Sequence, residues 1–263
     1  MSVMDAPSDG IAKADESASS WKAPKSSVAP SLPALPSALQ RGPRCPPAAE
    51  AHAVQNMTTI QEHVKRVSGG RGIPPERLAD FAKCHEFLVK RLQEVQMAPS
   101  VMQFAVAAAA YLNMAAELHQ VWSQPPGTGK TRTLAALVYI MASLGGYKDI
   151  TIRCPGKHIL EQDKEVLAEL AEAVKAAGTV VRLRCGVQGL GQLDTVELID
   201  ECDTFILDND RFDQLRHGLG AFIGLTATPL KDGPHSTEAD LVAALGIHIH
   251  DSLVPPMCSL EQT

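Results

Sequence analysis

Apolar positions follow two alternating periods in the chain after residue 98. Short apolar runs, typical of buried strands, occur at 120–123, 149–154, 179–183, 195–199 and 221–225. Segments with apolar residues at helical spacing lie between several of them, at 133–144, 157–177 and, more briefly, 208–216. Strands that alternate with helices predict an α/β fold, in which helices cover both faces of a mostly parallel sheet. Ligands of such sheets bind beyond the carboxyl ends of the strands.

The chain before residue 99 has a different pattern. Residues 1–55 are rich in Ser, Ala and Pro, and such a segment buries too little apolar surface to offset its ordering entropy. We therefore predict a disordered tail over 1–55, followed by a helical extension over 56–98. Two helices are expected in the extension, at 57–67 and from Pro75 to about Met97, where one face carries apolar residues that include Val95.

The remaining residues, 99–263, form the predicted α/β domain. It opens with a helix at 100–118, for which Ser100 is a suitable N-cap. It closes with a short helix at 239–246 and a strand at 247–250.

Composition narrows the class of protein. Hydrophobic residues make up 45% of the 263 positions and aromatic residues only 4%, which favours a helix-rich α/β core. No apolar run approaches the roughly 20 residues of a membrane helix, and no secretory signal is present, so we expect an intracellular protein of cytoplasm or nucleus. The six cysteines include no C-x-x-C pair, and we expect buried free thiols rather than a zinc site or disulfide framework.

One loop carries the strongest chemical signal. It runs Gln124-Pro125-Pro126-Gly127-Thr128-Gly129-Lys130-Thr131 and fits the phosphate-loop pattern G-x-x-x-x-G-K-[ST], except that Gln124 replaces the first glycine. The glycines let backbone N–H groups converge on a phosphate, the lysine adds positive charge, and Thr131 offers a hydroxyl to Mg²⁺. A helix that begins there favours an anion further. The sequence therefore predicts ATP and Mg²⁺ as cofactors, with Arg132 as an additional contact.

A pair of acids follows a later predicted strand. Asp200 ends that strand and is expected to hold Mg²⁺ opposite Thr131, while Glu201 is the candidate base that polarises the attacking water. An acidic turn after a buried strand is the alternative interpretation. The phosphate loop upstream in the same sheet favours the functional one.

Four segments together resemble the superfamily 2 helicases and translocases, the DEAD-like group. Asp200-Glu201-Cys202-Asp203 is similar to their D-E-x-D box, and Gly224-Leu225-Thr226-Ala227-Thr228-Pro229 to the motif whose threonines couple nucleotide state to nucleic-acid binding. Pro155 to Gln162 resembles their P-x-x-x-L-x-x-Q segment, and Pro99 to Gln103 the element whose glutamine reads adenine. The resemblance covers about residues 99–230. It implies a RecA-like ATP-binding lobe, a DNA or RNA partner, a coupling role for Thr226 and Thr228, and adenine binding by Gln103.

The sequence lacks one part that members of that family carry. Family members carry a second RecA-like lobe whose arginines reach the γ-phosphate, whereas only 34 residues follow Pro229, and these include no arginine. The net charge of −6 also gives little support to nucleic-acid binding. We therefore expect an ATP-binding lobe, hydrolytic when a second lobe or a protein partner completes it. A non-catalytic, ATP-dependent protein-interaction module is the alternative, and an AAA-type ring ATPase is a weaker third.

Overall fold

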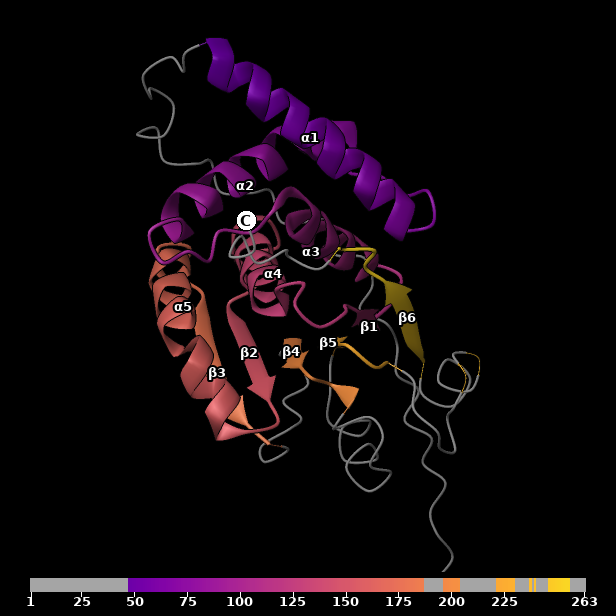
Figure 1. The fold of residues 1–263 in the computed structure, drawn as a ribbon, viewed down its shortest axis with the longest axis vertical. Coiled ribbons are helices and arrows are strands. Elements are labelled where there is room, and N and C mark those ends of the chain that lie inside the picture. Colours follow the sequence, from indigo (N-terminus) through magenta and orange to yellow (C-terminus); the bar gives the residue numbers. More distant parts are fainter. Residues whose placement is uncertain are drawn as a thin grey trace, which may run out of the picture. The chain divides into compact units, whose positions relative to one another are not determined.

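Six strands form a single sheet in the order β3-β2-β4-β5-β1-β6, and every neighbouring pair is parallel (Figure 1). The computed structural model describes residues 47–186, 196–203, 221–229, 237, 239 and 246–255. Within them the strands are β1 (His119–Ser123), β2 (Asp149–Cys154), β3 (Val180–Cys185), β4 (Val196–Asp200), β5 (Ala221–Thr226) and β6 (Ile247–Asp251). Every residue of β4 and β5 is buried, as expected for central strands covered on both faces.

The described helices are α1 (Pro47–Val67), α2 (Leu78–Leu92), α3 (Val101–Asn113), α4 (Lys130–Leu144) and α5 (Lys157–Lys175), with a 3-10 turn η2 (Pro75–Arg77) before α2. Helices α4 and α5 contact each other, and α3 packs against both α1 and α4. Residues 104–110 of α3 are all buried because this stretch is apolar around its whole circumference. Its small alanines let the two neighbouring helices approach closely.

The predicted fold class is confirmed. The chain has the α/β fold of a P-loop NTPase, with a parallel RecA-like sheet and the phosphate loop between β1 and α4. Residues 204–220 between β4 and β5, and most of the residues between β5 and β6, lie outside the described residues. The helices predicted at 208–216 and 239–246 fall there, as do most of the residues of the predicted tail over 1–55.

Three predicted helix ends were wrong. Helix α1 begins at Pro47, earlier than the predicted start at residue 57, because Pro suits a first helical position and an alanine-rich stretch follows it. Helix α2 ends at Leu92 rather than near Met97, since Gln96 adopts a left-handed conformation with φ 55°. Val95 therefore lies outside the helix and is 37% exposed.

The third correction concerns α3, which ends at Asn113 and not at residue 118. Its start is as predicted: Ser100 Oγ accepts a hydrogen bond from the Gln103 backbone N at 3.2 Å. The Gln103 side chain returns one, accepting from the Ser100 backbone N at 2.7 Å. This reciprocal capping box fixes the first turn of the helix.

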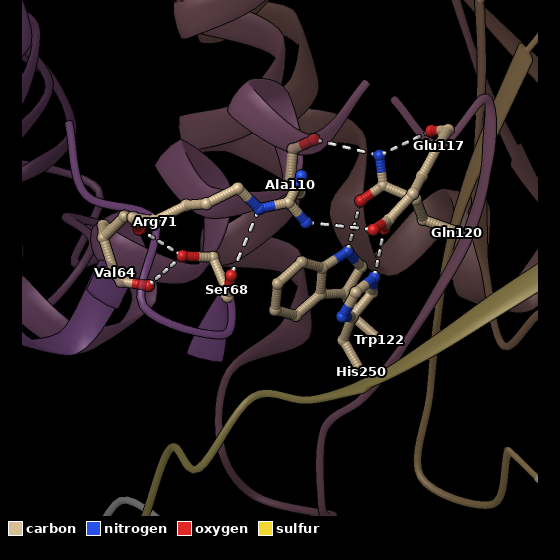
Figure 2. Close-up of polar contacts among 8 residues, drawn as sticks. All are labelled: Val64, Ser68, Arg71, Ala110, Glu117, Gln120, Trp122 and His250. Atoms are coloured by element: carbon tan, nitrogen blue, oxygen red, sulfur yellow. Dashed lines mark hydrogen bonds and ion pairs between the residues drawn. The ribbon is translucent and has the colours of Figure 1, made fainter. Parts of the chain in front are cut away.

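A chain of polar contacts joins the N-terminal helical region to the sheet (Figure 2). Arg71 Nη2 lies 3.0 Å from Glu117 Oε1, and His250 Nε2 lies 2.6 Å from Glu117 Oε2. The His250 ring stacks on Trp122 of β1 with ring centroids 4.5 Å apart, and Trp122 Nε1 donates to Gln120 Oε1 at 3.0 Å. The α1–α2 connection, β1 and β6 are thus held together by side chains that are distant in sequence.

A second contact of the same kind involves a buried histidine. His63 Nε2 of α1 lies 2.9 Å from the Ser252 carbonyl oxygen, just after β6. Ser68 Oγ closes the end of α1 by donating to Val64 O at 2.6 Å, and Arg71 Nε donates to Ser68 O at 3.2 Å (Figure 2). The elements from α1 to β6 consequently form one compact unit. Among the described helices, none has the length and apolarity that a bilayer crossing requires.

Candidate nucleotide-binding site

The predicted phosphate loop connects the carboxyl end of β1 to the first turn of α4. Gly127 has φ 73° and Gly129 has φ 76°, a left-handed conformation that side chains disfavour. Gly129 is the N-cap of α4 and Lys130 its first residue, so the helix N-terminus opens onto the loop. A Cβ atom added at Gly127 would meet nothing within 4 Å, which leaves open space beside the loop backbone.

Buried side chains hold this loop from the protein side. Thr128 is fully buried, and its Oγ1 donates to Pro125 O at 2.6 Å. The Thr128 carbonyl oxygen in turn accepts a hydrogen bond of 2.6 Å from Gln103 Nε2. Gln124, which stands where the pattern has glycine, is also fully buried and donates through Nε2 to Thr133 Oγ1 at 3.0 Å. The loop shape is therefore fixed by Gln103, Gln124 and Thr128 together.

The acid pair lies against this loop. Lys130 Nζ is 2.9 Å from Glu201 Oε1, although the two residues belong to α4 and to the turn after β4. Glu201 has φ 48°, an uncommon conformation for a residue with a side chain. Strain of this kind clusters at functional sites, where the surrounding structure enforces it. The structure thus brings together the two residues predicted to be catalytic.

Each predicted metal ligand is next in sequence to one member of the Lys130–Glu201 ion pair. Asp200 is the last residue of β4 and only 6% exposed; it is in register with Leu225 of β5, while Thr226 pairs with Ser123 of β1. The carboxyl ends of β4, β5 and β1 therefore lie side by side, and Thr131 follows Lys130 directly. A carboxylate and a hydroxyl next to a phosphate loop are oxygen donors of the kind that Mg²⁺ prefers. These residues fit a Mg-nucleotide.

The threonine motif contacts the last acid of the D-E-x-D box. Thr226 Oγ1 donates to Asp203 Oδ1 at 2.8 Å, and Thr228 Oγ1 donates to Asp203 Oδ2 at 3.1 Å. Thr228 N also donates to Thr226 Oγ1 at 3.1 Å. The Thr226 carbonyl oxygen accepts from Gln124 N at 2.8 Å. A continuous path of hydrogen bonds therefore runs from the acid box, through the threonines, to the phosphate loop.

Asp203 is a candidate site residue that the sequence pattern does not single out. It is the last member of the D-E-x-D box, whose predicted roles fall on Asp200 and Glu201. Asp203 is buried, and both carboxylate oxygens are used by the two threonines predicted to couple the site. The spacing D-E-x-D was the available signal, because a residue three positions after Asp200 can turn back toward the neighbouring strand.

A close contact between Cys202 and Gly224 packs the turn after β4 against β5. Cys202 N donates to Leu225 O at 3.2 Å, and its side chain is completely buried. A Cβ atom at Gly224 would lie 2.5 Å from Cys202 Sγ and 2.7 Å from Cys202 Cβ, closer than real contacts allow. Burial raises the pKa of the Cys202 thiol, and the neighbouring acids raise it further, so the residue packs as an apolar group.

Other predicted residues lie elsewhere around the loop. Arg132 Nη2 donates to Gln96 O at 2.7 Å, toward the segment that follows α2. The Gln103 amide contacts Ser100 and Thr128 and is fully buried. Pro125, Pro126 and Gly127 are exposed on the outer side of the loop. Pro155 and Gly156 follow β2 as predicted, and the side chains of Leu160 and Gln162 lie outside the described set.

No protein-family model and no curated protein matches this sequence. Among solved structures, the SWI2/SNF2 ATPase core of Sulfolobus solfataricus in complex with dsDNA aligns at 13% identity and a TM-score of 0.38, over 65% of this chain and 35% of that one. The large terminase of bacteriophage HK97 aligns at 11% identity and a TM-score of 0.39, over 78% and 46%. The chain spans less than half the length of either protein. Identities and scores this low transfer no function to it.

Proposed function

We propose that this chain is the ATP-binding lobe of a superfamily 2 helicase-like ATPase, acting inside the cell on DNA or RNA and completed by a second RecA-like lobe or a partner in trans. The observation that carries the proposal is the 2.9 Å contact between Lys130 Nζ and Glu201 Oε1. This contact supports the proposal because Lys130 belongs to the predicted phosphate loop and Glu201 is the candidate base. An anion-binding loop and an acid pair meet there as nucleotide hydrolysis requires.

Each residue then has a defined task. The loop amides and Lys130 bind the β- and γ-phosphates, and Thr131 with Asp200 would hold Mg²⁺, whose charge neutralises the phosphate oxygens when it is bound. Glu201 accepts a proton from the attacking water once a phosphate has replaced it beside Lys130. Thr226 and Thr228 are coupled to the acid box through their hydrogen bonds to Asp203. Gln103 supports the loop, and we expect the adenine to bind next to it.

We propose a second lobe because phosphoryl transfer is accelerated by an arginine that reaches the γ-phosphate. Within 201–203, 221–229, 237, 239 and 246–255, the chain contains no arginine that could reach the γ-phosphate. Arg132, the arginine nearest the loop in sequence, donates to Gln96 O instead. Arginine charge on a transferring phosphoryl group is worth on the order of 10³-fold or more in rate. Slow hydrolysis by the isolated chain, accelerated by a completing lobe, is the expected behaviour.

The test measures Mg-ATP binding by calorimetry and phosphate release with and without single-stranded DNA, duplex DNA or RNA. Binding with release that nucleic acid stimulates supports the proposal. Glu201→Gln should retain binding and lose release, whereas Glu172→Gln, the same change on the exposed end of α5, should alter neither. Binding without release in any condition, equal in wild type and Glu201→Gln, would instead favour the ATP-dependent interaction module. Absence of binding would refute both.

A further inference from the structure

Two cysteines that are distant in sequence end neighbouring strands. Cys154 is the last residue of β2 and Cys185 the last residue of β3, and they are register partners in the parallel ladder. Gly186 N donates to Cys154 O at 3.0 Å, which confirms their direct pairing. Neighbouring strands lie about 4.8 Å apart. Disulfides span Cα separations of roughly 4.4–6.8 Å, so the backbone already holds these residues at bonding distance.

The two sulfur atoms also lie on the same side of the sheet. Cys154 Sγ is 3.6 Å from the Gly156 carbonyl oxygen, and Cys185 Sγ is 3.8 Å from the Pro155 carbonyl oxygen. Both thiols therefore point at the two-residue turn that follows β2. Cys154 is only 3% exposed, whereas Cys185 is half-buried, so solvent reagents reach the pair through Cys185.

The other described cysteines have different surroundings. Cys84 is buried on the apolar face of α2, and burial raises its thiol pKa to about 12. Cys202 is enclosed against Gly224 in the acid-box turn. Among the cysteines that the structure describes, Cys154 and Cys185 are the pair that shares a register position.

We propose that Cys154 and Cys185 form a vicinal dithiol, a modification site that a low-molecular-weight disulfide such as glutathione disulfide converts into an intramolecular disulfide. The Cys185 thiol loses its proton to water, and its thiolate attacks one glutathione sulfur. The glutathione S–S bond breaks, and the first glutathione leaves as a thiolate that takes up a proton. Cys154, deprotonated in turn, attacks the Cys185 sulfur and releases the second glutathione. The protein loses two electrons and glutathione disulfide gains them.

The bond would tie together two segments at the carboxyl edge of the sheet. Arg153 Nη1 donates to Gly186 O at 2.5 Å, and the guanidinium forms a buried ion pair with Glu197 on β4. The strand ends at Cys154 and Cys185 are thus already linked by Arg153, and the disulfide would add a covalent link beside the Pro155–Gly156 turn. Strands β4 and β5 separate β2 from β1, so Mg-ATP binding should be unchanged by oxidation.

The experiment treats the reduced full chain with glutathione disulfide in native buffer, alkylates the remaining thiols and maps the cysteines by mass spectrometry. The expected product links the Cys154 and Cys185 peptides with the loss of two hydrogen atoms, and dithiothreitol reverses it. Cys154→Ser should stop at a mixed glutathione disulfide on Cys185, whereas Cys84→Ser should react as wild type does. A lasting mixed disulfide on wild-type Cys185, a link to Cys45 or Cys258 instead, or a link that forms only in denaturant would overturn the proposal. Mapping of the wild type decides this even if a variant fails to fold.

Discussion

The Lys130 ammonium group and the Glu201 carboxylate form an ion pair of 2.9 Å across the carboxyl edge of the sheet. The Lys130 side chain is 14% exposed and that of Glu201 33% exposed, so water and ligands reach the pair. The two opposite charges stabilise each other, so the ion pair holds the turn after β4 against the phosphate loop. Under the proposed function, a phosphate that binds Lys130 competes with Glu201 for the ammonium group.

Removal of the lysine tests the phosphate site directly. Lys130→Ala should abolish Mg-ATP binding in calorimetry because the loop then lacks its fixed positive charge. Lys175→Ala is the matched control, since Lys175 is an exposed lysine that pairs with Glu172 on the same helix. Unchanged nucleotide affinity in Lys130→Ala would show that the loop is not the binding site.

A substitution at Gln103 tests whether its side chain supports the loop or recognises adenine. Its Nε2 holds the Thr128 carbonyl oxygen at 2.6 Å. If that contact is its main contribution, Gln103→Ala should weaken ATP and GTP binding to a similar degree, because both depend on the loop. A loss confined to ATP would instead show that the amide reads the base. Competition titrations with the two nucleotides give the answer.

The two threonines should differ in their effect on stability. Thr226 is fully buried, whereas Thr228 is exposed, and both donate to Asp203. Thr226→Val removes one hydrogen-bond donor from a buried carboxylate, and we expect the free energy of unfolding to fall by about 1–3 kcal/mol. Thr228→Val should cost clearly less because water can replace its hydroxyl. Urea denaturation of both variants measures the difference, and equal losses would contradict the contact path.

Gly224 should not tolerate a side chain. A Cβ atom there would overlap both Cys202 Sγ and Cβ, and overpacking of this kind costs about 1–3 kcal/mol. Cys202→Ala should restore the stability of Gly224→Ala only in part, since the overlap with Cβ remains. Thermal denaturation of Gly224→Ala, alone and combined with Cys202→Ala, measures both effects. A Gly224→Ala melting temperature equal to that of wild type would contradict this packing.

Because His85 is buried, we expect the stability of the fold to depend on pH. Burial lowers the pKa of His85 below its ordinary value of 6.5, and among the described residues its Nε2 has no hydrogen-bond partner. The unfolded chain therefore binds more protons than the fold, so stability is full above about pH 6.5 and is lost as the pH falls toward the lower folded pKa. His85→Phe removes this titration and can keep the ring contact with Phe104. Its melting temperature should depend less on pH between about 5 and 7 than that of wild type, and an unchanged slope would exclude His85 as a source.

Local sequence patterns were sufficient to predict much of the fold. Each described strand of the sheet was predicted within two residues of its observed bounds, because a buried strand and its flanking turns are encoded in neighbouring positions. Helix ends were less predictable. Gln96 ends α2 in a left-handed conformation without the glycine that usually signals it, and Asn113 ends α3 without a glycine or proline. Pro47 begins α1 inside a stretch whose proline content indicated disorder.

The sequence by itself determined the α/β class, the phosphate loop and the acids that face it, since these depend on residue type and short spacing. Only the tertiary structure decided which atoms meet. Glu201 contacts Lys130, and Asp203 accepts hydrogen bonds from Thr226 and Thr228. Gln124 is buried beneath the loop, and Cys154 is the register partner of Cys185. Strand order and register are set by hydrogen bonds and packing between segments far apart in the chain, and no local pattern contains them.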